Sequence, residues 1–599
     1  MTRLSLVQGG LLRDGAPHRI VSGSIHYFRV HPKQWGDRLD RLAAMGANTL
    51  DTYVAWNFHE SRPGRADFGG WRDLPRFIAL AGERGLDVIV RPGPYICAEW
   101  DNGGLPAWLT GRPGIALRTS DPAYTEAVDA WFSVLMPRLT PLQSDRGGPI
   151  VAWQIENEYG SYADDAEFME FNREALVRHG ATELLYTADG PTELMQDGGS
   201  LTGSLSTATF GSRPQASFAL LEARRPGTAL MCAEYWNGWF DHWGEKHHVR
   251  TPESVAADVD AMLAANGSVS IYMAHGGTNF GLWAGANHDG VLQPTITSYD
   301  SDAPIAEDGT LTPKWHALRE VITARLGTTP PAPPAAPRFV SPSQAFAWVG
   351  TAELALPAHG ASGPSSSLPV PPTFEDLGLG SGLVRYTAHP ILPRGGAPLV
   401  LEGLRDLATV WVDGVAVAAF GTEAAASGVE LAGDGQRHRV DVLVEAYGHI
   451  NYGQLLGERK GLLGVPRLER RRITGWEALP VDLEAVDAST LAPVRGGAPI
   501  AGSCAVGGHV AVAEVELDEA LDGHLRLPGW GRGYVWINGQ LLGRYDEVGP
   551  QRTLYVPAPF LQAGRNTVTL LEMRRLGELP VWEGAADLGE TEQFIELFD

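Results

Sequence analysis

Eight apolar runs alternate with helix-like stretches through the first 320 or so residues of the chain. The runs are apolar at nearly every position, which is typical of strands in a parallel sheet that is covered on both faces. The stretches between them, such as residues 32–47 and 75–85, have the spacing of amphipathic helices. Eight such units predict an α/β fold, a (β/α)8 TIM barrel, whose functional residues lie at the C-terminal ends of the strands. The runs span residues 19–28, 47–56, 86–95, 149–158, 183–190, 204–211, 228–236 and 268–277.

A proline- and alanine-rich segment, residues 328–337, ends this pattern and predicts a semi-rigid linker. Beyond it, short alternating runs and glycine-rich turns favour all-β sandwich domains. Residues 408–421 and 533–546 resemble each other, and each contains an Asp-Gly or Asn-Gly turn that predicts a hairpin. We therefore expect two related, jelly-roll-like sandwiches. The predicted domains are a barrel over 1–327, the linker, a first sandwich over 338–490 and a second over 491–599.

The composition excludes several classes of protein. The 71 acidic and 47 basic residues give a formal net charge of −24, which disfavours nucleic acid and anionic membranes as partners. No window of about 18 apolar residues predicts a transmembrane helix. The three cysteines, Cys97, Cys232 and Cys504, lie too far apart in the sequence for a disulfide framework. The first residues lack the apolar segment of a secretion signal, so we expect a cytoplasmic location.

Two of the apolar runs end in glutamates. Residues 149–158 end in Glu156, Asn157 and Glu158, and residues 228–236 contain Glu234, which is followed by several aromatic residues. Carboxylates at the end of a buried strand are costly unless they are paired or used, so a structural salt bridge is the alternative for each. In the predicted barrel, Glu158 ends the fourth strand and Glu234 the seventh. Two carboxyls that meet across the barrel mouth suit retaining cleavage of a glycosidic bond, which needs them about 5–5.5 Å apart.

Seven motifs in the first 315 residues resemble those of glycoside hydrolase family 35, the family of acid and neutral β-galactosidases. They occur in the family's order and read VSGSIHYFRV, DTYVAWNFHE, RPGPYICAEWDNGGLPAWL, GGPIVAWQIENEYGSY, CAEYWNGWFDHWG, YMAHGGTNFG and SYDSDAPIAEDG. Residues 529–545 and 549–557 resemble the family's C-terminal, galactose-binding-like jelly roll. The resemblance implies a retaining exo-β-galactosidase that removes terminal non-reducing β-D-galactose by double displacement.

The resemblance also implies roles for individual residues. Glu158 falls on the family's acid/base, Glu234 on its nucleophile and Asn157 on the residue that binds the sugar 2-hydroxyl. A regular strand would point Asn157 and Glu158 to opposite faces, so we expect the strand to end or bulge there. Tyr272 and Tyr299 are expected to approach the nucleophile. The implied galactose-binding residues are Tyr53, Cys97, Ala98, Glu99, Asn157, Tyr272 and Tyr299.

Two alternative functions stay open at this point. Some family relatives act on other β-hexosides, such as β-glucosaminides. Ala55, Ala274 and Ser301 depart from the family pattern, and the loss of bulk at Ala274 and Ser301 predicts a wider or reshaped pocket, which leaves the sugar preference open. The other alternative is a catalytically dead carbohydrate-binding protein. The presence of Glu158, Glu234 and the pocket residues argues against it.

No metal or organic cofactor is expected, because double displacement requires none. His242, His247 and His248 lie close in sequence, but their spacing matches no metal-binding motif. Trp530 and Trp536 are expected to pack inside the second sandwich rather than bind polysaccharide. The expected partners are galactose-containing saccharides. Sandwich modules of this kind often form contacts between subunits, which makes a homodimer a further expectation.

Overall fold

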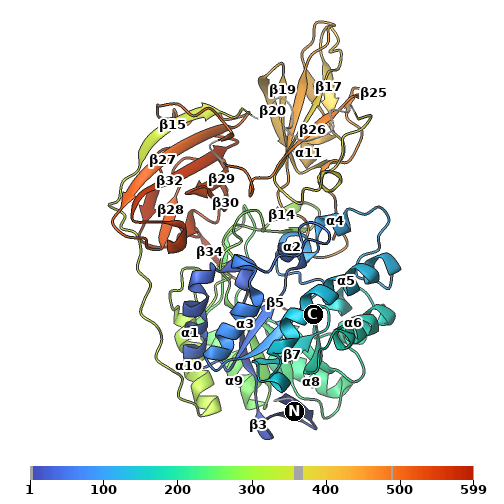
Figure 1. Ribbon diagram of the computed structural model, residues 1–599, viewed down its shortest axis with the longest axis vertical. Helices are drawn as coiled ribbons and strands as arrows, with labels where there is room; N and C mark the ends of the chain where they lie inside the picture. Colours follow the sequence, from blue (N-terminus) through green and yellow to red (C-terminus); the bar gives the residue numbers. More distant parts are fainter. Residues whose placement is uncertain (1–3, 356–367, 488–489, 598–599) are drawn as a thin grey trace.

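The computed structural model describes residues 4–355, 368–487 and 490–597. Its first domain is a closed barrel of eight parallel strands (Figure 1). All eight strands fall within the apolar runs that the sequence predicts, and each is almost entirely buried. In barrel order they are β4 (Val21–Ile25), β5 (Thr49–Tyr53), β6 (Asp87–Arg91), β7 (Ile150–Gln154), β8 (Leu184–Asp189), β9 (Leu205–Phe210), β10 (Met231–Trp236) and β12 (Ser268–His275).

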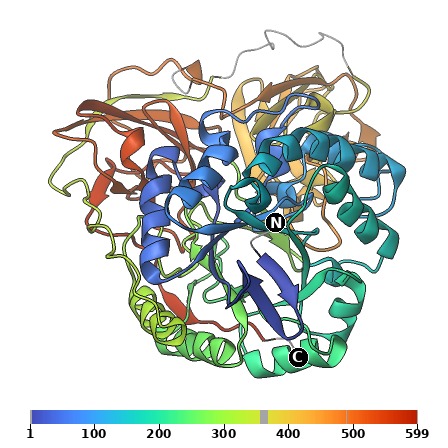
Figure 2. The ribbon, with the colours of Figure 1, turned by 60° about the horizontal axis from the view of Figure 1, so that its bottom comes forward.

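An outer ring of helices covers the barrel (Figures 1 and 2). Helix α1 falls within residues 32–47, which the sequence predicts to form an amphipathic helix. It begins at Trp35 and ends where Gly46 adopts a left-handed conformation with φ 102°. The ring consists of α1 (Trp35–Met45), α3 (Leu74–Glu83), α5 (Pro122–Leu139), α6 (Ala166–Arg178), α7 (Glu193–Gly199), α8 (Pro214–Arg224), α9 (Pro252–Ala264) and α10 (Pro313–Leu326). Two short helices, α2 (Trp56–His59) and α4 (Ala107–Thr110), lie in loops that follow strands.

A small antiparallel sheet closes the N-terminal end of the barrel (Figure 2). It consists of β1 (Leu4–Val7), β2 (Gly10–Arg13) and β3 (Ala16–His18). Leu4 and Leu11 of this sheet belong to one buried cluster with Ile89, Val151 and Ala233 of the barrel strands. The N-terminal end of the barrel is thus filled by packed apolar side chains. The active site is therefore expected at the opposite, C-terminal end.

The proline-rich segment 328–337 forms neither helix nor strand, as the sequence predicts. It runs along the helical ring, where Arg41 donates to the carbonyl of Ala335 at 2.7 Å and Arg319 donates to that of Pro331 at 3.2 Å. The next strand, β15 (Ala347–Glu353), then pairs with β27 (His509–Leu517). The linker therefore carries the chain past the barrel and into a sheet whose other strands come much later in the sequence.

The first sandwich consists of two facing sheets with a core that includes Trp476 and Val442. The larger sheet has the order β20 (Val415–Gly421), β19 (Leu407–Val412), β22 (Val440–Glu445), β16 (Leu383–Ala388) and β26 (Glu477–Val481). The smaller has the order β21 (Val429–Leu431), β17 (Ala397–Val400), β24 (Arg467–Leu468) and β25 (Arg471–Arg472).

The second sandwich includes a strand that the sequence assigned to the first. Its larger sheet has the order β15, β27, β32 (Gly564–Glu572), β29 (Arg532–Ile537) and β30 (Gln540–Asp546). Opposite it lie β31 (Thr553–Val556), β28 (Gly523–Arg526) and β33 (Val581–Glu583). The predicted range 338–490 for the first sandwich is therefore wrong at its start. Alternation of polar and apolar residues identifies a strand but does not say which sheet edge it joins.

Both predicted hairpins are confirmed. β19 and β20 turn at Asp413 and Gly414, and β29 and β30 turn at Asn538 and Gly539; all four residues have positive φ, as a type I′ turn requires. Both hairpins also have a register irregularity at the equivalent place, before Trp411 and before Trp536. Trp530 is buried in the core of the second sandwich, as expected, whereas Trp536 is buried between the two sandwiches, in a cluster with Leu383 and Leu443 of the first.

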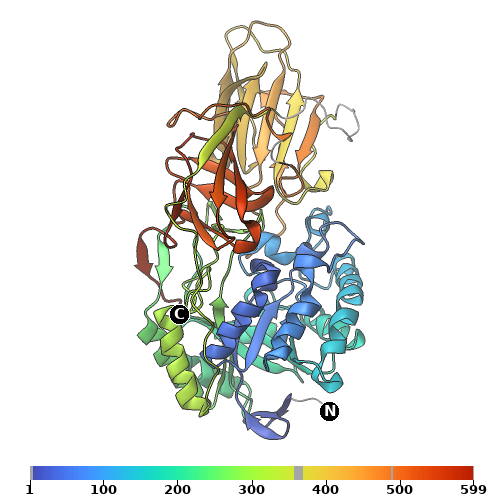
Figure 3. The same cartoon turned by 60° about the vertical axis from the view of Figure 1, so that its left-hand side comes forward.

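Both sandwiches stand over the end of the barrel where its strands finish (Figures 1 and 3). The loop after β22 contacts the loops after β6 and β12: the Tyr95 hydroxyl donates to the carbonyl of Asn451 at 2.6 Å, and Ala286 forms a bridge with Ile450. No helix among residues 4–355, 368–487 and 490–597 is long and apolar enough to cross a membrane.

Candidate active site

The fourth barrel strand stops before the motif that follows it, and this exposes the motif to the barrel mouth. β7 ends at Gln154, and both Glu156 (φ 55°) and Glu158 (φ 46°) have left-handed backbone conformations that non-glycine residues seldom adopt. The adjacent Asn157 and Glu158 therefore both line one pocket, as the expected end of the strand requires. Glu156 instead points to Arg118, whose guanidinium donates to it twice, at 2.8 and 2.7 Å. Glu156 thus forms a structural ion pair, which was the alternative to a catalytic role.

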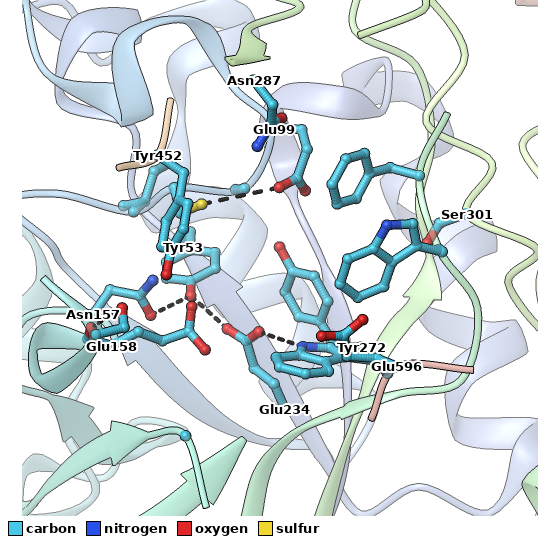
Figure 4. Close-up of a pocket in the computed structure, with 18 of the residues that line it drawn as sticks. Tyr53, Glu99, Asn157, Glu158, Glu234, Tyr272, Asn287, Ser301, Tyr452 and Glu596 are labelled. Carbon is cyan, nitrogen blue, oxygen red and sulfur yellow. Dashed lines mark hydrogen bonds between the residues drawn. The ribbon is translucent and has the colours of Figure 1, made fainter. Parts of the chain in front are cut away.

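Glu234 lies on the seventh strand, β10, and lines the same pocket as Glu158 (Figure 4). Three donors hold its carboxylate. Arg91 donates to Oε1 at 2.5 Å, the Tyr53 hydroxyl donates to Oε1 at 2.6 Å, and the Trp236 indole donates to Oε2 at 3.0 Å. Arg91 is fully buried, so its charge is little screened by solvent. This arrangement stabilises a negative charge and fixes the direction of the carboxylate.

Glu158 has a different environment. Among the described residues, its carboxyl has one hydrogen-bond partner, the Thr209 hydroxyl of β9, which donates to Oε1 at 2.7 Å. Burial, followed by the nearby charge of Glu234, raises the pKa of Glu158 to about 8. Three donors therefore surround the Glu234 carboxylate, whereas the Glu158 carboxyl is kept protonated at neutral pH. Such unequal surroundings separate a nucleophile from a general acid.

Asn157 has a fixed amide orientation. Its Oδ1 lies 2.6 Å from the Tyr53 hydroxyl, and it accepts from Arg91 at 2.9 Å and from Gln154 at 3.0 Å. Its Nδ2 is buried and has no partner in the described part of the chain. A buried donor without a partner is costly, so this N–H group is available to a ligand in the pocket.

The loop after β6 brings Cys97, Ala98 and Glu99 into the pocket. All three have positive φ, between 47° and 57°, a run that turns the chain sharply back toward the barrel axis. The Tyr299 hydroxyl donates to Glu99, and burial raises the pKa of this carboxyl. Burial also raises the pKa of the Cys97 thiol, which makes it a poor nucleophile and fits a packing role.

The structure brings all nine predicted site residues into one pocket with an empty volume of about 1010 Å³, including its open mouth. Two details differ from expectation. The hydroxyl that contacts Glu234 belongs to Tyr53, whereas that of Tyr299 donates to Glu99. Ser301 lines the pocket, but Ala274 does not: it faces the helical ring, where its Cβ limits the space beside Gly23. The predicted widening at Ala274 is therefore wrong, because its side chain points away from the cavity.

Sequence reasoning gave no individual role to four residues that contribute to the pocket or position its carboxyls. Arg91 ends the apolar run of β6, and Trp236 follows Glu234 by two residues, so a charged or aromatic residue at a strand end is the signal that would have found them. Tyr452 follows β22 and Glu596 is in the C-terminal tail, and both line the pocket from outside the barrel. No local pattern marks these two, because only the packing of domains brings them here.

The histidines that precede β11 (His247–Val249) and lie within it pair with carboxylates. His247 and His248 contact Asp241 at 2.7 and 3.0 Å, and His242 contacts Glu245 at 3.0 Å. No cluster of three or more metal-ligating side chains occurs among the residues that the structure describes.

A barrel with a donor-held carboxylate at the end of its seventh strand, and a carboxyl of raised pKa after the fourth, defines a glycoside hydrolase. The comparisons with known proteins identify its family. Residues 10–325 match the model of the family described as "Glycosyl hydrolases family 35", and the chain belongs to this family. Residues 371–482 match "Beta-galactosidase, first all-beta domain", and residues 509–566 match "Beta-galactosidase, galactose-binding domain".

Curated relatives match over nearly the whole chain. A protein of Bos taurus named "Beta-galactosidase" is 41% identical over 98% of this chain and 92% of its own length. The "Beta-galactosidase" of Mus musculus is 39% identical over 99% of this chain and 94% of its own length. The "Beta-galactosidase-1-like protein" of Mus musculus is 41% identical over 95% of this chain and 89% of its own length. The similarity therefore includes both sandwiches as well as the barrel.

Proposed function

We propose that this chain is a retaining exo-β-galactosidase that removes terminal β-D-galactose from saccharides. The observation that carries the proposal is the unequal pair in one pocket: Glu234 is held by three donors, and Glu158 has a pKa raised to about 8. The names of the relatives support galactose as the sugar.

In the first step, the Glu234 carboxylate attacks the anomeric carbon while Glu158 donates its proton to the glycosidic oxygen. The bond to the leaving group breaks, and a covalent galactosyl ester forms on Glu234. The free Nδ2 of Asn157 donates to the sugar 2-hydroxyl, a contact that tightens as positive charge develops at the ring.

In the second step, the ionised Glu158 takes a proton from water, which attacks the anomeric carbon and releases galactose with retained configuration. Formation of the ester neutralises Glu234. Because the charge of Glu234 is one cause of the raised pKa of Glu158, the pKa of Glu158 falls at this stage. The same carboxyl thereby changes from acid to base when the reaction needs it.

The closed end of the pocket supports exo action. Glu99 and Tyr299 are hydrogen-bonded to each other, and only 7% and 2% of their surface is exposed. The cavity therefore ends at these two side chains. In this proposal the terminal sugar lies between this end and the two glutamates, which line the same pocket. The buried carboxyl of Glu99 accepts hydrogen bonds from the sugar hydroxyls.

The test is a set of matched chromogenic β-glycosides: galactoside, glucoside, glucosaminide and fucoside. We expect kcat/KM to be highest for the galactoside, and NMR of the first product to show the β-anomer. A higher kcat/KM for the glucosaminide would show that the substrate sugar is glucosamine and not galactose. Release of the α-anomer as the first product would contradict the retaining mechanism. No hydrolysis of any substrate would favour the dead carbohydrate-binding alternative.

A further inference from the structure

The C-terminal tail returns from the second sandwich to the barrel (Figure 3). Its strand β34 (Thr591–Gln593) pairs in parallel with β11, which follows the seventh barrel strand. The His247 N–H donates to the carbonyl of Glu590 at 2.8 Å, and the Phe594 N–H donates to the carbonyl of Val249 at 3.0 Å. Backbone bonds at both ends of the strand thus fix the tail against the barrel.

Side chains continue this anchoring toward the pocket. The ring of Phe594 lies 4.9 Å from that of Trp239 and 5.0 Å from that of His248, measured between centroids. The Ser212 hydroxyl, two residues after the end of β9, donates to the carbonyl of Glu596 at 3.0 Å. The ring contacts of Phe594 and the hydrogen bond to the Glu596 carbonyl therefore fix the position of Glu596.

The side chain of Glu596 lines the same pocket as Glu158 and Glu234 (Figure 4). The described part of the chain offers its carboxylate no hydrogen bond or ion pair, although the residue is half-buried. Burial raises its pKa. A carboxylate that faces the cavity and receives no hydrogen bond from the described residues keeps its oxygens free to accept hydrogen bonds from a ligand.

The position of the tail indicates which part of the substrate it meets. The closed end of the pocket is formed by Glu99 and Tyr299, from the loops after β6 and β12. The tail lies instead over the ends of β9 and β10: a Cβ on Gly211, which follows β9, would lie 3.2 Å from the Cβ of Glu596. β9 also carries Thr209, the partner of the proposed proton donor Glu158. A leaving group that takes its proton from Glu158 extends away from the closed end, toward the tail.

We infer that Glu596 is a specificity-determining residue that accepts hydrogen bonds from the hydroxyls of a sugar leaving group, beside the aromatic surface of Trp236 and Trp239. This inference rests on the proposed function. Both indoles line the pocket, and such rings pack against the apolar face of a sugar while a carboxylate binds its edge. The second sandwich thus contributes to substrate choice through its last residues.

The experiment compares two substrates that share galactose and differ in the leaving group. Lactose carries a sugar with several hydroxyls, whereas methyl β-galactoside carries a group with none. Hydrogen bonds to a charged acceptor are among the stronger ones in proteins. We expect Glu596→Ala to lower kcat/KM for lactose by about tenfold or more, and for methyl β-galactoside by about twofold at most. Glu596→Gln, which keeps an acceptor oxygen, falls between.

Glu592→Gln is the matched control, because Glu592 is on the same tail but its carboxylate pairs with His248 at 3.4 Å and lies outside the pocket. We expect this variant to retain the wild-type ratio of the two substrates, and thermal unfolding to show that all variants are folded. Equal losses on both substrates, or no loss on either, would overturn the role of Glu596 and leave the proposed function intact. Failure of the wild-type protein to hydrolyse either substrate would instead overturn the proposed function, and this inference with it.

Discussion

At the scale of the residue, the site depends on a difference between its two proposed catalytic carboxyls in the number of hydrogen-bond donors around them. Glu234 has a buried guanidinium, a phenol and an indole, whereas Glu158 has one hydroxyl among the described residues. The motifs around both residues allow their roles to be predicted from the sequence. The partners that create the difference, Arg91 and Thr209, come from other strands, and only closure of the barrel brings them together.

Removal of the proposed proton donor has a chemical signature. Glu158→Ala should lower turnover of a disaccharide by about 10²–10⁴, because general acid catalysis contributes about that much. The loss should be smaller for a substrate whose leaving group needs no proton. Added azide should yield β-galactosyl azide, since the variant leaves space beside the ester and no base to activate water. A variant with the wild-type rate and pH profile would refute the assignment.

The raised pKa of Glu158 predicts the alkaline limit of activity. The group must be protonated to act as an acid, so kcat/KM should be high below its pKa and should decrease as the pH rises through about 8. Measurement of kcat/KM across this range of pH tests this, with the fold of the enzyme monitored throughout. In Glu158→Ala the alkaline decrease should disappear, and its persistence would assign it to another group.

At the scale of the element, short segments with special backbone geometry position the side chains. The left-handed residues Cys97, Ala98 and Glu99 form the pocket floor, and Glu156 and Glu158 end the fourth strand. The sequence anticipated that this strand must end or bulge near Asn157, because two adjacent residues had to reach one sugar. The turn at Cys97 was not predictable in the same way, since none of its residues is one that favours positive φ.

Two glycines of the β29–β30 hairpin test the turn and the packing separately. Gly539 has φ 79° and open space around it, so Gly539→Ala should cost about 1–2 kcal/mol from backbone strain alone. A Cβ on Gly533 would lie 1.9 Å from the carbonyl oxygen of Leu571, so Gly533→Ala should destabilise by more than about 3 kcal/mol. Chemical denaturation gives both values. The reverse order would contradict the register of β29 against β32.

At the scale of the whole molecule, the sandwiches are part of the site. Tyr452 and Glu596 reach the pocket from outside the barrel. The order of domains was predictable from the linker and the change of pattern, but the pairing of β15 with β27 was not, because it joins segments far apart in the sequence. The homodimer and the cytoplasmic location stay predictions.

A buried ion pair joins the first sandwich to the barrel. His449 lies 3.0 Å from Asp101 and 3.2 Å from Glu375; burial opposes its charge, but these carboxylates outweigh burial and raise its pKa to about 10. Because this value lies above the pKa of an unfolded histidine, the stabilisation is fully present below about pH 6.5 and is lost as the pH rises through about 10.

His449→Gln should therefore lower the free energy of unfolding by about 3–5 kcal/mol at about pH 6, since it leaves the buried carboxylate of Asp101 without its cation. The difference from wild type should shrink as the pH approaches about 10. Thermal unfolding of both proteins at several pH values measures it. A difference that does not change with pH would show that His449 is neutral in the folded protein.

The central claim is that Glu234 forms the covalent bond to the sugar. A 2-fluoro galactosyl inhibitor with a good leaving group would trap this ester, because fluorine slows its hydrolysis more than its formation. Mass spectrometry of the digested protein should then find the fluorosugar on the peptide that contains Glu234, and Glu234→Ala should remain unlabelled. Label on Glu158 or on any other residue, or inactivation without a covalent adduct, would contradict the account.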